Sequence, residues 1–166
     1  GSVAPEVQAR LCRLLARAAG HSGMAGGQAI DLASVGQALT EDQLRSMHRL
    51  KTGALLEGSV MMGASCGAAS APANQALRTY GAALGLAFQV VDDILDVTAD
   101  SVTLGKTAGK DAAQDKPTYV SLLGLERSRA HAQELLADAI AALDASHLTD
   151  TRALRALADM VVNRNN

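Results

Sequence analysis

The chain has 166 residues and a formal net charge of −2. This length accommodates one domain with a hydrophobic core and is too short to argue for two. Hydrophobic residues make up 48% of the chain and aromatic residues only 2%, and about one residue in five is alanine. This composition favours helices over sheets and excludes intrinsic disorder. We therefore predict a single all-α domain over residues 1–166.

Charge and cysteine content exclude several classes of function. A net charge of −2 gives no general electrostatic reason to bind nucleic acid or an anionic membrane. No apolar run reaches the roughly 18 residues of a membrane-spanning helix, and we recognise no signal peptide, so we expect a cytoplasmic protein. Cys12 and Cys66 lack the spacing of a zinc site, and we predict buried thiols. Because the sequence opens with Gly1 rather than methionine, we expect a piece of a longer protein.

Apolar periodicity, first-turn prolines and terminal glycines predict a series of helices. In chain order they cover residues 5–19, 28–32, 40–66, 73–98, 118–123, 127–143 and 151–162. Thr40 and Gln43 have the spacing of a capping box, which starts the third of these helices. Between residues 100 and 117 the periodicity vanishes, and glycine, lysine and aspartate predict a charged loop.

The helix predicted over residues 73–98 carries an acidic stripe. Gln89, Asp92, Asp93 and Asp96 follow the spacing i, i+3, i+4 and i+7, which places one amide and three carboxylates on one face. The residues on both flanks are apolar, so this helix should be buried nearly all round. A site made of carboxylates, without histidine or cysteine, favours a hard cation such as Mg²⁺. Substrate phosphates typically complete the coordination of this ion. We predict that the three aspartates bind Mg²⁺.

A solvated acidic face is the alternative interpretation of this stripe. Aspartate has a low helix propensity, and like charges four residues apart repel each other by a few tenths of a kcal/mol. The stripe also lies toward the end of the helix where the helix dipole disfavours negative charge. A local cost of this kind indicates a function.

Lysines placed to bind a phosphate occur in two segments. Lys51, followed by Thr52, interrupts an otherwise apolar helix, where its ammonium group would reach a diphosphate. The alternative is a surface lysine with a solvated head group. Lys106 and Lys116 lie in the charged loop after the stripe, which would close over a ligand unless it is an ordinary solvated linker.

Four segments carry a resemblance to a known family. They read GGQAIDL at 26–32, KTGAL at 51–55, FQVVDDILD at 88–96, and LGK at 104–106 followed by KPTY at 116–119. In order and spacing they resemble the trans-isoprenyl diphosphate synthases, most closely the bacterial farnesyl diphosphate synthase (geranyltranstransferase) type. The match covers essentially the whole chain but only the C-terminal half of such an enzyme. The family's first aspartate-rich motif has no counterpart here.

The resemblance implies the C-terminal portion of an all-α isoprenoid-synthase helical bundle. It also implies an Mg²⁺-dependent transferase of isoprenoid biosynthesis, which condenses isopentenyl diphosphate with an allylic diphosphate and acts as a homodimer. Asp92 would ligate Mg²⁺ directly, and Asp93 and Asp96 would hold the ion and its waters. The residues implied to be catalytic are Lys51, Thr52 and Lys106. Those implied to bind substrate are Gln28, Lys51, Thr52, Gln89, Lys106 and Lys116, while Asp31 and Asp111 also fall on family positions.

Three functions remain open at this point. The chain is the C-terminal half of a prenyltransferase and inactive alone, or it is a non-catalytic partner or regulatory homologue that binds Mg²⁺–diphosphate, or it is a helical interaction module. The first is favoured because a subunit without chemistry has no need to keep a costly acidic stripe. Product length cannot be read from these residues.

Overall fold

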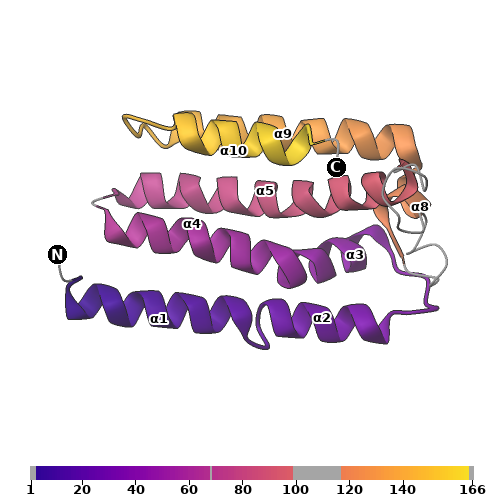
Figure 1. The fold of residues 1–166 in the computed structure, drawn as a ribbon, viewed down its shortest axis with the longest axis horizontal. Coiled ribbons are helices and arrows are strands. Elements are labelled where there is room, and N and C mark those ends of the chain that lie inside the picture. The colour runs from indigo at the N-terminus through magenta and orange to yellow at the C-terminus, as the bar shows by residue number, and fades with distance from the viewer. Residues whose placement is uncertain (1–2, 68, 99–116, 165–166) are drawn as a thin grey trace.

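A computed structural model describes residues 3–67, 69–98 and 117–164. Within these ranges the chain forms a bundle of helices and no strand (Figure 1), which confirms the predicted all-α class. The elements, in chain order, are α1 (Pro5–Ala19), α2 (Met24–Ala33), α3 (Glu41–His48), η1 (Arg49–Gly53), α4 (Ala54–Cys66), α5 (Ala71–Thr98), α8 (Tyr119–Leu123), α9 (Leu125–Ala145) and α10 (Arg152–Val162). The segment 100–117 falls outside the described residues except for Pro117.

Helix α2 starts earlier than predicted, within the glycine-rich segment. It begins at Met24, four residues before the predicted start, and takes in both Gly26 and Gly27. A Cβ atom on Gly27 would lie 2.2 Å from the backbone nitrogen of Lys51, so α2 and η1 approach each other backbone to backbone. Glycine is therefore required here by close packing rather than by a turn.

The long helix predicted over residues 40–66 is continuous but contains a π-helical turn. Its start is confirmed, because the Gln43 backbone donates to Thr40 Oγ1 at 3.3 Å and the Thr40 backbone donates to Gln43 Oε1 at 2.8 Å. The π-helical turn η1 lies between α3 and α4 and contains Lys51 and Thr52. π-Helical turns occur frequently at functional sites, since they redirect the side chains that they carry.

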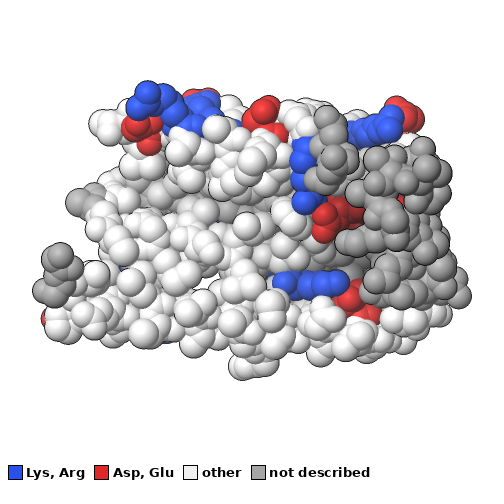
Figure 2. All heavy atoms as spheres, viewed as in Figure 1, with Lys and Arg blue, Asp and Glu red and all other residues white. Residues whose placement is uncertain are grey.

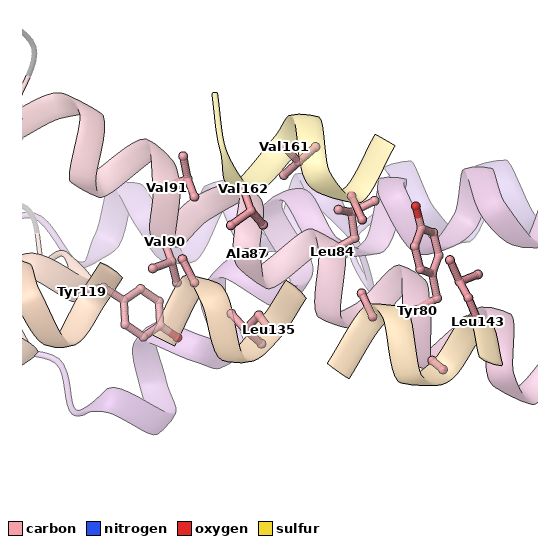
Figure 3. Packing of buried hydrophobic residues seen from close by; sticks show 14 of the residues in the cluster. Tyr80, Leu84, Ala87, Val90, Val91, Tyr119, Leu135, Leu143, Val161 and Val162 are labelled. Carbon is pink, nitrogen blue, oxygen red and sulfur yellow. The ribbon is translucent and has the colours of Figure 1, made fainter. Parts of the chain in front are cut away.

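Helix α5 is the centre of the bundle. It contacts α4 and η1 on one side and α9 and α10 on the other, as the rows of helices in Figure 1 show. Tyr80, Leu84 and Val90 of α5 are almost completely buried in the core shown in Figure 3. The Tyr80 hydroxyl donates to the carbonyl of Leu154 at 2.8 Å, which ties α5 to α10. This packing fixes the position of the acidic stripe.

Two expectations about burial are wrong. Cys12 and Cys66 are exposed rather than buried. Cys12 lies one helical turn before Leu15, which is 50% exposed, on the face of α1 turned away from α4. Cys66 is the last residue of α4. The apolar flanks of α5 are also less covered than expected at its end, where Val97 is exposed.

The described helices include none that combines the length and the apolar character needed to cross a membrane.

Candidate functional site

A cavity of about 290 Å³ lies where α2, η1, α5 and the start of α8 meet. Its lining residues are Asp31, His48, Lys51, Thr52, Phe88, Gln89, Asp92, Asp93, Pro117 and Thr118. Half of these are predicted site residues. Cavities of about 560 and 620 Å³ elsewhere in the bundle contain none of the predicted residues. Figure 2 shows basic and acidic side chains meeting in the right half of the face toward the viewer.

Lys51 is directed toward this cavity and paired. Its Nζ atom donates to Asp31 Oδ2 at 2.8 Å, and 29% of the lysine side chain is exposed against 6% of the aspartate. The interpretation of Lys51 as a solvated surface lysine is therefore wrong. The π-helical turn supplies the orientation, and the close approach at Gly27 brings α2 with Asp31 alongside. The pair places one ammonium group, balanced by one carboxylate, in the lining of the cavity.

The acidic stripe divides between two roles. The Asp92 side chain is 47% exposed, lines the cavity and accepts a hydrogen bond from Gln89 Nε2 at 3.4 Å. Asp93 is buried, and its Oδ2 accepts the backbone N–H of Tyr119 at 2.7 Å. Asp96 is half-buried and lies one helical turn further along α5, outside the cavity lining. Only the first carboxylate of the stripe is both at the cavity and open to solvent.

This arrangement fits a magnesium ion that keeps most of its waters. Among the residues described, no three His, Cys, Asp or Glu side chains converge as a ready-made metal site. Mg²⁺ is usually held by only one or two carboxylates together with substrate phosphates and water, rather than by a cage of protein ligands. Asp92, half-exposed at a cavity that Lys51 also lines, matches that pattern.

Arg164 belongs to the site but was not predicted from the sequence. It follows α10 and forms an ion pair with Asp92. Its guanidinium group also donates to the backbone carbonyl of Phe88 at 3.1 Å and lies 4.1 Å from the centre of the Phe88 ring. The only signal in the sequence is a lone arginine after the last helix. Its ion pair with Asp92 forms because α10 packs against α5.

His48 is the second residue that sequence reasoning missed. It is the last residue of α3, is 5% exposed and stacks on Tyr119 with a distance of 5.8 Å between ring centres. Burial, followed by the nearby charge of Lys51, lowers the pKa of its imidazole to about 4. His48 is therefore neutral at pH 7. Nothing in the sequence pattern distinguishes it from a core histidine.

Not all of the remaining predicted residues line the cavity. Thr52 lines the cavity beside Lys51, as expected. Gln28 is exposed on α2 and is not among the lining residues, because the face of α2 turned toward η1 carries Gly27 and Asp31 instead. The predicted residues Lys106, Asp111 and Lys116 lie outside the described part of the chain.

Comparison with known proteins identifies a family over most of the chain. The sequence profile of the family described as "Polyprenyl synthetase" matches residues 3–157. Farnesyl diphosphate synthase of Escherichia coli K12 is 48% identical over 154 residues, which cover 91% of this chain and 52% of that protein. The chloroplastic geranylgeranyl pyrophosphate synthase 7 of Arabidopsis thaliana is 42% identical over 168 residues, which cover 99% of this chain and 48% of that protein.

The fold is likewise shared with solved structures. A geranyltransferase of Helicobacter pylori, solved in complex with magnesium and isoprenyl diphosphate, superimposes with a TM-score of 0.80 at 33% sequence identity. The superposition covers 97% of this chain and 52% of that one. The chain thus spans about half the length of the relatives that it matches.

Proposed function

Because this chain belongs to the polyprenyl synthetase family, we propose that it is the C-terminal half of an Mg²⁺-dependent prenyltransferase. The enzyme would condense isopentenyl diphosphate with an allylic diphosphate to give farnesyl or geranylgeranyl diphosphate, the products for which the two relatives are named. The observation that carries the proposal is the cavity that Lys51 and Asp92 line together with Phe88 and Gln89.

Asp92 is the residue proposed to bind Mg²⁺ directly, with Asp93 and Asp96 supporting the site. When bound, the ion would neutralise part of the negative charge that develops on the departing diphosphate. Lys51, which lines the same cavity, would supply positive charge to this group once the phosphate competes with Asp31 for its ammonium. The resemblance assigns the same role to Lys106.

The other lining residues would protect and orient the reacting allylic group. Phe88 is half-buried at the cavity and Thr52 lines it beside Lys51. An apolar wall excludes water, which would otherwise capture the allylic cation before the double bond of isopentenyl diphosphate attacks it. Gln89 contributes a side-chain amide that donates toward Asp92. We propose that this amide also donates to the diphosphate, as the resemblance implies.

The chain alone is proposed to bind Mg²⁺–diphosphate without turnover. A leaving group with this much charge needs neutralisation from both sides, and the chain carries only one of the family's two aspartate-rich motifs. The homodimer expected from the resemblance and the cytoplasmic location expected from the sequence stay predictions.

An assay with labelled isopentenyl diphosphate, geranyl diphosphate and Mg²⁺ tests this function. We expect a longer product from the chain extended upstream to the length of its relatives, and none from the 166-residue chain. Asp92→Ala in the extended chain should lower kcat at least about 100-fold, as loss of a residue that stabilises the leaving group does. Turnover by the 166-residue chain would refute the half-enzyme proposal. Mg²⁺–diphosphate binding without turnover by the extended chain would instead support a non-catalytic partner.

A further inference from the structure

His48 is buried at the cavity with its hydrogen-bonding capacity unused. Neither ring nitrogen has a hydrogen-bond partner among the described residues, although the ring is 5% exposed. A buried polar group without a partner is unfavourable, and its presence in a native fold needs an explanation. Simple packing does not require a histidine at this position, since the stack on Tyr119 needs only an aromatic ring.

The side chain best suited to hydrogen-bond the His48 imidazole is that of Gln89. Gln89 is also buried, lines the same cavity and lies near enough to the His48 ring to favour its protonated form. Its Nε2 atom is directed at Asp92 Oδ2, at a long distance of 3.4 Å. An amide whose nitrogen faces Asp92 presents its oxygen as the acceptor for a second group.

Building on the proposed function, we propose that His48 is a positioning residue, whose ring N–H binds Gln89 Oε1 and so holds the Gln89 amide nitrogen toward Asp92 and the diphosphate. The imidazole suits this role because it is neutral at pH 7 and therefore offers one donor and one acceptor. A protonated ring would repel Lys51 on the same wall. Residues that hydrogen-bond to the groups around a metal commonly fix the orientation of those groups.

His131 provides a control that contacts the same tyrosine ring. Its ring centre lies 5.7 Å from that of Tyr119, and its Nε2 atom also lacks a hydrogen-bond partner among the described residues. It does not line the cavity. A role in packing alone would be shared by both histidines, whereas a role in orienting Gln89 belongs to His48.

Calorimetric titration with inorganic pyrophosphate in the presence of Mg²⁺, at pH 7.5, tests this role. We expect His48→Phe, which keeps the aromatic stack, to weaken binding about tenfold or more, as loss of a supporting hydrogen bond does. His48→Asn or His48→Gln restores an N–H near one of the two ring nitrogens, and one of them should bind within about threefold of the wild type. His131→Phe should change the affinity less than about twofold.

A spectroscopic readout separates orientation from fold. In the ¹⁵N-histidine-labelled protein, the signal of the protonated ring nitrogen of His48 should shift when Mg²⁺ and pyrophosphate are added, while that of His131 should not. Equal affinity of wild type and His48→Phe, or equal losses in His48→Phe and His131→Phe, would overturn the inference and leave the proposed function standing. A wild type that binds no Mg²⁺–pyrophosphate would refute the proposed function and with it this inference.

Discussion

The backbone N–H of Tyr119 donates to Asp93 Oδ2 at 2.7 Å, which joins the first residue of α8 to the middle of the acidic stripe on α5. Tyr119 is completely buried and Asp93 nearly so. We propose that these neighbouring carboxylates of one motif serve two purposes. Asp93 holds the backbone at Tyr119, and Asp92, its half-exposed neighbour at the cavity, meets a ligand.

Replacing the two aspartates should separate these purposes. We expect Asp93→Ala to lower the free energy of unfolding by about 1–3 kcal/mol, because it leaves the buried Tyr119 N–H without this acceptor. Asp92→Ala removes an ion pair with Arg164 in which the aspartate is half-exposed, and should cost at most about 1 kcal/mol. Urea unfolding in metal-free buffer measures both. Equal losses in the two variants would show that the stripe is not divided in this way.

A glycine pair tests the close approach of α2 to η1. A Cβ atom on Gly27 would lie 2.2 Å from the backbone nitrogen of Lys51, so Gly27→Ala must push the two segments apart. We expect a loss of about 1–3 kcal/mol in stability, as overpacking usually causes. Gly63 on α4 has no neighbouring atom within 4 Å of such a Cβ, so Gly63→Ala should stabilise the helix by up to about 1 kcal/mol. A stable Gly27→Ala variant would contradict the observed packing.

The sequence predicts those features that depend on local spacing. The helix that ends before Gly20, the capping box at Thr40 and the acidic stripe are all confirmed as structural elements, because each follows from periodicity along a single helix. The π-helical turn is not visible in this way, since one extra residue per turn leaves the apolar pattern readable as an ordinary helix.

Features that depend on tertiary packing lie beyond the sequence pattern. His48 lines the cavity and Arg164 pairs with Asp92 only because the end of α3 and the segment after α10 are brought to α5 from distant parts of the chain. The buried state expected for Cys12 fails because Cys12 lies beside the stripe of Leu11, Leu14 and Ala18 that α1 turns inward, rather than on it. Helical spacing predicts that Gln89 lies beside Asp92, and the family resemblance implies that Lys51 lies at the same site, where all three line the cavity.

The low pKa of His48 predicts a pH dependence of stability. Burial lowers this pKa from the ordinary 6.5 to about 4 in the folded protein. Between these two pH values the unfolded chain binds more protons than the folded one. The contribution of neutral His48 to the free energy of unfolding is therefore present in full above pH 6.5 and is lost as the pH falls toward 4. The free energy of unfolding should therefore decrease less between pH 7.5 and pH 5 in His48→Phe than in wild type. The difference should be up to about 1.4 kcal/mol for each pH unit below 6.5. Parallel losses would show that His48 is not a buried neutral group.

Arg164 and Mg²⁺ should compete for the Asp92 carboxylate. The guanidinium group pairs with Asp92 and is also held on Phe88, so a metal ion must displace the pair before it binds. We expect Arg164→Ala to raise the affinity for Mg²⁺ without diphosphate by up to about fivefold, the equivalent of one partly exposed ion pair. Arg152→Ala, which removes an exposed pair with Asp150 at the start of α10, is the control. Weaker Mg²⁺ binding by Arg164→Ala would mean that Arg164 supports the metal rather than competes with it.

The central claim is that Asp92 binds Mg²⁺, and through it a diphosphate, in the cavity that Lys51 also lines. Calorimetric titration of inorganic pyrophosphate with and without Mg²⁺ tests this claim most directly. Wild type should bind pyrophosphate only when Mg²⁺ is present, because the carboxylate and the phosphates repel each other without the ion. Asp92→Asn should weaken that binding at least about tenfold, since a neutral amide oxygen is a weaker ligand for Mg²⁺ than a charged carboxylate. Binding that is independent of Mg²⁺, or that is unchanged in Asp92→Asn, would contradict the account.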